Sequence, residues 1–325
     1  MSDFRVMVTD DRFGSYAEEE QVLASIGAKL EVKQLGTEAE AIAALKDADA
    51  ILANLFPMTS AVIEGLSRCR VISRYGVGVD NVDIEAATRQ GIWVARVPDY
   101  CVEEASDQAL ALLLGCVRKL AYKDRRVREG NWNLHRDYPT HRIAGQTLGL
   151  IGFGAVAHCL RRKVSGLGLG KILVNDPFVP AAAIEKEGCI SVGLSTLLSE
   201  SDFISVHVPL TSETRGFIGH KELATMKPGA ILVNTSRGPV LDELALTSAL
   251  VEKRLGGAGL DVFEKEPLPR DSGLRALDTV IFSDHTSWYS LESVTELKTK
   301  AARNIVDVLS GGKPTYPVNA PLKKR

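Results

Sequence analysis

The stretch from Gln146 to Asp176 constrains the fold of this chain more than any other part of the sequence. It begins with an apolar, β-prone run at Thr147–Ile151, which two closely spaced glycines interrupt, and apolar residues then follow at helical spacing. A second apolar run, Ile172–Val174, leads to Asp176. This order of strand, tight turn, helix and strand is the setting in which a glycine-rich turn binds a dinucleotide.

The residue types in this turn meet the needs of a bound dinucleotide. Gly152 permits the tight turn, Gly154 lets backbone amides approach a pyrophosphate, and Ala157 is small enough for close helix–strand packing. The Asp176 carboxylate would accept both adenosine ribose hydroxyls and repel a 2′-phosphate, so NAD is predicted over NADP. The alternative is an ordinary strand–helix–strand turn with an incidental aspartate. The residues expected to contact the cofactor here are Gly152, Phe153, Gly154, Ala155 and Val156.

The composition excludes several classes of protein. With 325 residues the chain is long enough for two domains, and a net charge of -2 gives no reason to expect nucleic acid or a membrane as partner. The N-terminus lacks the apolar segment of a signal peptide, and no apolar run is long enough to span a bilayer. Five scattered cysteines without a CxxC pair favour reduced thiols over disulfides or a metal site. The chain is therefore expected to be a cytoplasmic globular protein.

The first hundred residues alternate short apolar runs with helix-patterned segments. They predict a small parallel sheet covered by helices, with ligands at the carboxyl edge of its strands. The Tyr75–Asp80 loop, YGVGVD, lies at that edge and offers backbone amides that could hold a carboxylate. The alternative is a glycine-bearing turn without a ligand. Strands are expected at 5–9, 30–33, 50–53, 71–74 and 92–95.

A long helix is predicted from Glu103 to Arg128, after a hinge at 98–100. Its centre, ALALLLGCV, is apolar on too many sides for a helix that covers only one sheet. We interpret this helix as a dimerisation element, and a helix buried within its own chain is the alternative.

The rest of the chain repeats the alternation of strands and helices, and a last helix is predicted at 290–309. The predicted fold class is α/β with two doubly wound parallel-sheet domains. A Rossmann-type NAD-binding domain is expected at 101–289, and a flavodoxin-like substrate domain is expected from 1–100 and 290–325. The C-terminal tail, PTYPVNAPLKKR, would return to the first domain, and a cleft would separate the two sheets.

Reactive side chains follow the later strands, at the edge where the nicotinamide end of a dinucleotide would lie. Arg237 follows one strand, Glu266 lies beyond the next, and His285 follows the last. An arginine can clamp a carboxylate with two donors, a histidine can donate a proton near neutral pH, and a carboxylate can orient that histidine. Each residue alone is more often structural. Together they predict hydride transfer to or from the carbonyl of a 2-oxo acid.

These motifs resemble the D-isomer-specific 2-hydroxyacid dehydrogenase family over nearly the whole chain. The resemblance implies an NAD-dependent enzyme that interconverts 2-hydroxy and 2-oxo acids, with a split domain order and a homodimer formed through the long helix. The matching segments are GVGVDNVD (76–83), LGLIGFGAVA (148–157), ILVNDP (172–177), LVNTSRGPVLDE (232–243), GLDVFEKEP (259–267) and the histidine of SDHTSWYS (283–290).

The resemblance also implies roles for individual residues. His285 would be the general acid/base paired with Glu266, and Arg237 would bind the substrate carboxylate. The amides of Val77 and Gly78 would hold that carboxylate from the other domain. Asp176 would bind the adenosine ribose, and Asp261 would bind the nicotinamide carboxamide. The other residues implied to line the cofactor are His207, Val208, Pro209, Thr211, Thr235, Ser236, Arg237 and His285.

Departures from the family pattern leave the substrate open. Trp288, with VEEASD at 102–107, is similar to the C-terminal-binding-protein branch, whose members include NAD(H)-sensing corepressors. The chain is also similar to D-3-phosphoglycerate dehydrogenases, but Asn54–Pro57 lacks the arginine that this branch offers a phosphate. Leu55, Phe56 and Trp288 suggest a substrate with some apolar bulk. We expect a 2-oxo acid reductase; the alternatives are an NAD(H)-sensing dimeric interaction protein and a D-3-phosphoglycerate dehydrogenase.

Overall fold

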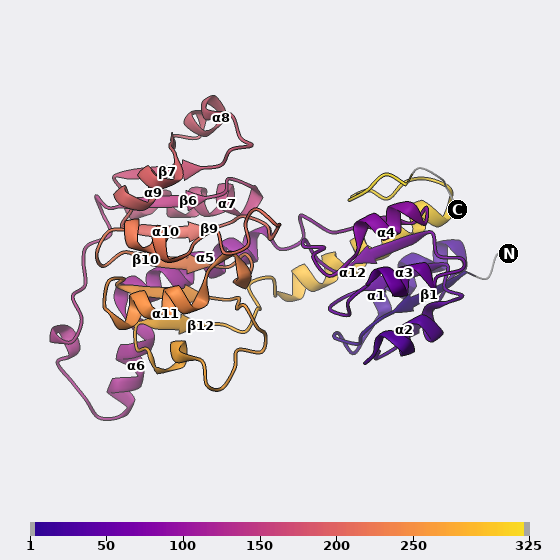
Figure 1. Cartoon of the computed structure of the whole chain (residues 1–325), viewed down its shortest axis with the longest axis horizontal. Coiled ribbons are helices and arrows are strands. Elements are labelled where there is room, and N and C mark those ends of the chain that lie inside the picture. The colour runs from indigo at the N-terminus through magenta and orange to yellow at the C-terminus, as the bar shows by residue number, and fades with distance from the viewer. Residues whose placement is uncertain (1–3, 322–325) are drawn as a thin grey trace. The chain divides into compact units, whose positions relative to one another are not determined.

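The computed structural model describes residues 4–321 and divides the chain into two compact units. Of the described residues, unit 1 contains 4–100 and 290–321, and unit 2 contains Cys101–Tyr289. Each unit is built on one parallel sheet with helices packed on it (Figure 1), so the predicted α/β fold class is confirmed. Within the described residues, no helix has both the length and the apolar character needed to cross a membrane.

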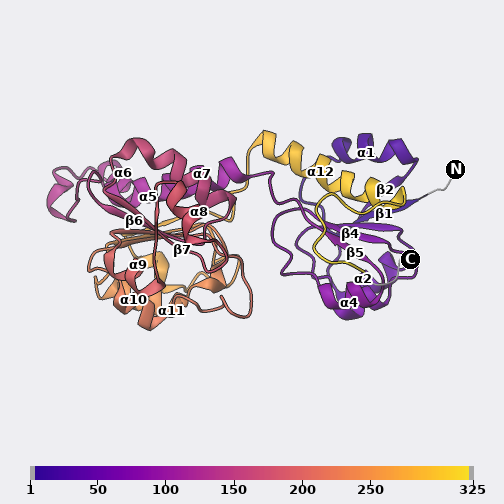
Figure 2. The ribbon, with the colours of Figure 1, turned by 90° about the horizontal axis from the view of Figure 1, so that it is seen from above.

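Unit 1 is built on a five-stranded sheet. Its strands are β1 (Arg5–Val8), β2 (Lys29–Val32), β3 (Ala50–Ala53), β4 (Val71–Arg74) and β5 (Trp93–Ala95), in the order β2-β1-β3-β4-β5. Its helices are α1 (Ala17–Leu23), α2 (Glu38–Leu45), α3 (Ser60–Glu64), α4 (Ile84–Arg89) and α12 (Leu291–Leu309), with a 3₁₀ turn η1 (Ala24–Ile26). α1 and α12 cover one face and α2 and α4 cover the other (Figure 2). The central strand β3 is therefore buried along its whole length.

The C-terminal segment returns to the edge strand β5, as the sequence predicts. Pro317 forms an antiparallel bridge with Ala95, and the Val318 N–H donates to the carbonyl of Val94. The Asn319 side chain accepts the Val94 N–H at 2.7 Å. These bonds cover the free edge of the sheet, and residues 322–325 of the predicted tail lie outside the described residues.

Unit 2 is built on a seven-stranded parallel sheet. The chain starts in the middle of this sheet at β6, adds β7 and β8 on one side, and then returns to add β9 to β12 on the other side of β6. The strands are β6 (Thr147–Ile151), β7 (Lys171–Asn175), β8 (Ile190–Ser191), β9 (Phe203–Val206), β10 (Ile231–Asn234), β11 (Gly257–Leu260) and β12 (Val280–Phe282), in the order β12-β11-β10-β9-β6-β7-β8. The α-helices are α5 (Val102–Arg118), α6 (Leu120–Arg128), α7 (Ala155–Lys163), α8 (Ala181–Lys186), α9 (Leu194–Glu200), α10 (His220–Thr225) and α11 (Glu243–Val251). Short 3₁₀ turns are η2 (Leu134–Arg136), η3 (Val164–Leu167), η4 (Gly238–Val240) and η5 (Gly273–Ala276). Such a reversal opens a crevice at the carboxyl edge of a parallel sheet.

The long helix predicted at 103–128 is two helices, so that prediction was wrong at Lys119. Lys119 adopts a left-handed φ of 55°, which ends α5 and begins α6. Its ammonium donates to the carbonyl of Gly256 at 2.6 Å, which holds the break in place. α5 packs on α7, β10 and β11, with Leu112 and Leu113 buried. The alternative of burial within its own chain therefore accounts for the apolar centre of α5.

Candidate active site

The turn between β6 and α7 has the geometry of a dinucleotide-binding turn. Gly152 has φ +88°, and a Cβ at this position would lie 2.9 Å from the carbonyl oxygen of His207, so only glycine fits. Gly154 caps α7, and the space that a Cβ would occupy there is open. The fully buried Ala157 lets α7 pack closely on the sheet. A pyrophosphate can therefore approach the backbone at the start of α7.

Asp176 lies beside this turn, at the end of β7. Its two carboxylate oxygens accept the Phe153 N–H at 2.8 Å and the Phe178 N–H at 2.9 Å. Each oxygen keeps a lone pair for a further donor, such as a ribose hydroxyl. The structure therefore brings Asp176 and the glycine turn together, as a ribose-binding role requires.

Two buried polar atoms at the same edge of the sheet have no hydrogen-bond partner. They are Nε2 of His207, which follows β9, and Oγ1 of Thr235, which follows β10. Although part of His207 reaches the surface, burial of its imidazole lowers the pKa to about 4 and keeps the ring neutral at pH 7. Buried polar atoms are rarely left without a partner, so these two atoms fit a bound ligand with polar groups of its own.

The segment that follows β9 also carries Val208, Pro209 and Thr211. Thr214 ties this segment together, since its hydroxyl accepts the Thr211 N–H at 2.8 Å and donates to the carbonyl of Pro209 at 2.6 Å. The predicted cofactor-lining residues of this segment therefore lie on one ordered turn at the carboxyl edge.

The turn after β10 presents Arg237. The Asn234 side chain donates to the carbonyl of Arg237 at 2.9 Å and fixes the turn. Gly238 follows, and a Cβ there would lie 1.9 Å from the carbonyl carbon and oxygen of Phe263. Because Gly238 has no side chain, this turn packs directly on the segment that leads to Glu266.

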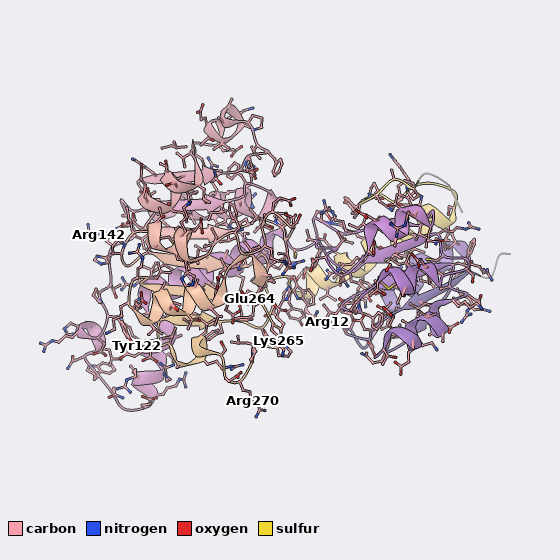
Figure 3. The ribbon with its side chains drawn as sticks, viewed as in Figure 1. Arg12, Tyr122, Arg142, Glu264, Lys265 and Arg270 are labelled. Atoms are coloured by element: carbon pink, nitrogen blue, oxygen red, sulfur yellow. The ribbon has the colours of Figure 1, made fainter. Side chains whose placement is uncertain are left out.

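His285 and Glu266 form the central pair of the site. Nδ1 of His285 lies 2.6 Å from Oε2 of Glu266, and the two side chains are 33% and 35% exposed. Burial raises the pKa of Glu266. The hydrogen bond and charge of His285, the hydrogen bond from the Phe263 amide and the charge of Arg237 lower it. The lowering effects are larger together, so the pKa of Glu266 lies below its usual value. The structure thus brings Arg237, Glu266 and His285 together. Glu264 and Lys265 mark the loop of Glu266 in Figure 3.

The loop that carries His285 is built around the buried Asp261. The Asp261 carboxylate accepts the hydroxyl of Ser283 at 2.6 Å and the N–H groups of Thr286 and Ser287 at 3.1 Å each. Its carbonyl accepts the N–H of His285 at 2.9 Å. Asp261 therefore holds the loop around His285. The sequence predicted only a contact of Asp261 with the cofactor and did not predict this structural role. The signal in the sequence was the cluster of small hydroxyl residues next to the histidine.

Trp288 supports the same loop from its other side. Its indole Nε1 donates to the carbonyl of His285 at 2.8 Å, and its ring meets that of Tyr289 edge to face at 5.6 Å. A contact of Trp288 with substrate stays a prediction.

In unit 1, the loop after β4 carries Val77 and Gly78 and rests on a buried hydrogen bond. Tyr75, at the base of the loop, donates its hydroxyl to Glu19 at 2.7 Å. Glu19 is fully buried and lies 3.5 Å from the ammonium of Lys298 on α12. The sequence prediction missed Glu19 among the acidic residues that begin α1, although its spacing of four from the buried Leu23 would have placed it on the inner face.

The loop after β3 carries Leu55 and Phe56. Both backbone amides donate to the Asp10 carboxylate, at 2.9 and 3.3 Å. Leu55 is 55% exposed, whereas Phe56 packs partly against the core of unit 1. Leu55 is therefore the more accessible of the two predicted substrate contacts.

Comparisons with known proteins identify one family. The family described as D-isomer specific 2-hydroxyacid dehydrogenase, NAD binding domain, matches residues 110–287. A glyoxylate reductase of Korarchaeum cryptofilum is 40% identical over 286 residues, which cover 86% of this chain and 85% of that protein. A D-3-phosphoglycerate dehydrogenase of Synechocystis sp. is 37% identical over 295 residues, 90% of this chain but 53% of that protein. The structure of D-lactate dehydrogenase from Aquifex aeolicus, complexed with NAD and lactic acid, has a TM-score of 0.87 at 27% identity and covers 97% of this chain and 99% of that one.

Proposed function

Because this chain belongs to the D-isomer specific 2-hydroxyacid dehydrogenase family, we propose that it reduces a small 2-oxo acid, such as glyoxylate, with NADH. Membership of the family makes it an oxidoreductase that acts on the CH–OH group of donors. The observation that supports reduction of a 2-oxo acid is the His285–Glu266 pair at 2.6 Å, with the charge of Arg237 beside it. These groups lie at the sheet edge whose glycine turn fits a dinucleotide.

Each residue of the site has one task in the proposed reaction. A bound NADH supplies the hydride that reduces carbon 2 of the 2-oxo acid. Arg237 binds the substrate carboxylate with two N–H donors. Because Glu266 engages Nδ1 of His285, Nε2 is the nitrogen that donates a proton to the carbonyl oxygen. The Glu266 carboxylate stabilises the imidazolium before the transfer and fixes the plane of the ring.

The preference for NADH over NADPH is supported by Asp176. Two backbone amides hold its carboxylate beside the glycine turn, where it would accept ribose hydroxyls and repel a 2′-phosphate.

We also propose the amides of Val77 and Gly78 as donors to the substrate carboxylate, and a homodimer formed through the region of α5 and α6. The sequence motif supports the first of these proposals, and exposed apolar side chains on α6 support the second.

Initial rates of NADH oxidation across a panel of 2-oxo acids test the proposed activity. The panel contains glyoxylate, pyruvate, hydroxypyruvate, phosphohydroxypyruvate and a branched 2-oxo acid, with NADPH run in parallel. We expect the highest kcat/KM with a small unphosphorylated acid, and a preference for NADH of at least about 10-fold, equivalent to about 1.4 kcal/mol. Turnover of phosphohydroxypyruvate alone would replace the proposal with a phosphoglycerate dehydrogenase. NADH binding without turnover of any acid would contradict the reductase and favour the sensing alternative.

A further inference from the structure

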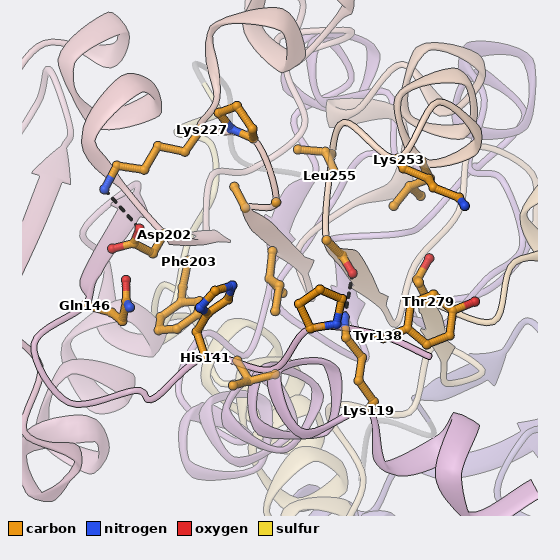
Figure 4. A pocket seen from close by; sticks show the side chains of 18 of the residues that line it. Lys119, Tyr138, His141, Gln146, Asp202, Phe203, Lys227, Lys253, Leu255 and Thr279 are labelled. Atoms are coloured by element: carbon orange, nitrogen blue, oxygen red, sulfur yellow. Dashed lines mark hydrogen bonds and ion pairs between the residues drawn. The ribbon is translucent and has the colours of Figure 1, made fainter. Parts of the chain in front are cut away.

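A cavity of about 690 Å³ lies at the amino edge of the unit 2 sheet (Figure 4). Phe203 and Ile231 begin β9 and β10, and both line it together with Gly256 and Thr279, which directly precede β11 and β12. Because the strands are parallel, this edge is opposite to the one that carries His285. The volume falls within the range of small-molecule sites, and the proposed reaction makes no use of it.

Lys119 is the anomalous group in the wall of this cavity. It is 7% exposed, and its ammonium makes one hydrogen bond, to the carbonyl of Gly256 at 2.6 Å. The ammonium also lies 5.9 Å from the centre of the Tyr138 ring. An ammonium has three N–H donors, so two of them remain for another acceptor.

No carboxylate of the described chain neutralises this ammonium. Burial lowers the pKa of Lys119, and the ionisable groups that act on it are the Cys116 thiol and the Lys123 ammonium. Buried charges in proteins are normally paired, because an isolated one loses its hydration without compensation. Lys119 therefore lacks a counter-ion, and the cavity is where one would lie.

The acidic residues around the cavity already have partners. Asp202 pairs with Lys227 at 3.0 Å and accepts the Thr147 N–H at 2.8 Å, and Figure 4 shows this pair on the side away from Lys119. Asp137 accepts the hydroxyl of Tyr122 at 2.7 Å. The lysines and aspartates of the lining, which are Lys119, Lys227 and Lys253 against Asp137 and Asp202, sum to a net charge of +1. The cavity thus favours an anion.

We propose that this cavity binds a small organic anion, with its carboxylate or phosphate group on Lys119 and an apolar body in the remaining space. Tyr138 and Thr279 line the cavity on the same side as Lys119 (Figure 4), and each carries a hydroxyl. The apolar body would pack against aliphatic and aromatic side chains, which are Val117, Phe203, Ile231, Leu250 and Leu255. The site is separate from the dinucleotide turn and independent of the proposed reduction.

Calorimetric titration of the full chain with inorganic phosphate and with phenyl phosphate, at constant ionic strength, tests the proposal. Phenyl phosphate joins the anionic group to an apolar body, so we expect it to bind more tightly than phosphate. Lys119→Met keeps the length of the side chain but removes the charge, and should weaken phenyl phosphate binding at least about 10-fold. Lys186→Met removes the charge of an exposed lysine on α8 and should leave the Kd unchanged.

Binding at Arg237 is the main competing result, and the variant Arg237→Gln separates the two sites. Retention of phenyl phosphate binding in Arg237→Gln and its loss in Lys119→Met support the cavity. The reverse pattern, or no heat with either probe, overturns the proposal. NADH fluorescence verifies that Lys119→Met is folded.

Hydrogen exchange of the wild-type chain gives a second readout that needs no variant. Phenyl phosphate should slow amide exchange at 137–141 and 253–257. Slowing confined to 152–157 and 235–238 would place the ligand at the dinucleotide edge and contradict the cavity site.

Discussion

His285 is held in an unfavourable backbone conformation so that its imidazole meets Glu266. Its φ of 57° lies in the left-handed region, which costs a residue with a Cβ about 1 kcal/mol. The N–H of His285 donates to the carbonyl of Asp261, and its own carbonyl accepts the indole N–H of Trp288. These two bonds offset the strain, and stored strain of this kind is found at functional sites.

Substitutions of His285 and Glu266 should lower kcat without weakening the binding of NADH. We expect His285→Ala to lower kcat by about 10²- to 10⁴-fold, because the proton donor is lost. Glu266→Gln should also lower kcat, because the imidazole loses the carboxylate that orients it. Steady-state kinetics measure both effects, and the Kd for NADH from fluorescence serves as the control. An unchanged kcat in His285→Ala would remove His285 from the proton-transfer role.

The buried imidazole of His207 should make the stability of the cofactor-free protein depend on pH. Its folded-state pKa of about 4 lies below the ordinary value of 6.5, so between these values the unfolded chain binds more protons. Stability should therefore fall as pH decreases from 6.5 to 4, by roughly 3 kcal/mol from this one residue. Urea unfolding of wild type and His207→Gln at pH 7 and pH 4.5 measures the difference. An equal loss of stability in both proteins would show that His207 is not its source.

At the scale of the elements, the sequence specifies the strands of this fold well because each strand is a short apolar run that ends in polar residues. The expected strand at 50–53 is β3, and the placement of Arg237, Glu266 and His285 after successive strands of one parallel sheet brought them to one edge. The break between α5 and α6 could not be read from local periodicity. At the break, the Lys119 side chain bonds to the carbonyl of Gly256, which lies 137 residues further along the chain. β8 escaped prediction because it is two residues long.

The turn after β10 packs against the segment after β11. The local sequence does not reveal this contact, but a substitution of Gly238 tests it directly. Gly238→Ala would place a Cβ within 1.9 Å of the Phe263 backbone, which a side-chain movement cannot relieve. We expect a loss of about 2–4 kcal/mol in the free energy of unfolding and a large loss of kcat, because the turn of Arg237 must shift. Gly166→Ala is the matched control, since nothing lies within 4 Å of its Cβ position. Similar unfolding midpoints for the two variants would contradict the tight packing.

At the scale of the whole molecule, each unit has its own hydrophobic core, and the groups proposed for chemistry belong to unit 2. The core of unit 1 includes Met7, Ile51 and Ile72, whereas that of unit 2 includes Leu150 and Leu232. With α5 buried inside unit 2, its apolar centre no longer argues for a dimer. The exposed apolar residues of α6 and of the segment after it now support a dimer instead.

Self-association through α6 is the prediction that belongs to the whole molecule. Leu120 and Val127 are 57% and 44% exposed and lie seven residues apart, on one face of α6, and the nearby Trp132 is 76% exposed. Light scattering after size exclusion should give twice the chain mass of 35.1 kDa for the wild type. The double variant Leu120→Glu/Val127→Glu should shift the protein to the monomer, because the charges would be buried without partners. Phe178→Glu, at an apolar side chain that is 93% exposed outside α6, is the control and should leave the dimer intact. A dimer that survives the double variant would place the interface elsewhere, and a wild-type monomer would refute the dimer itself.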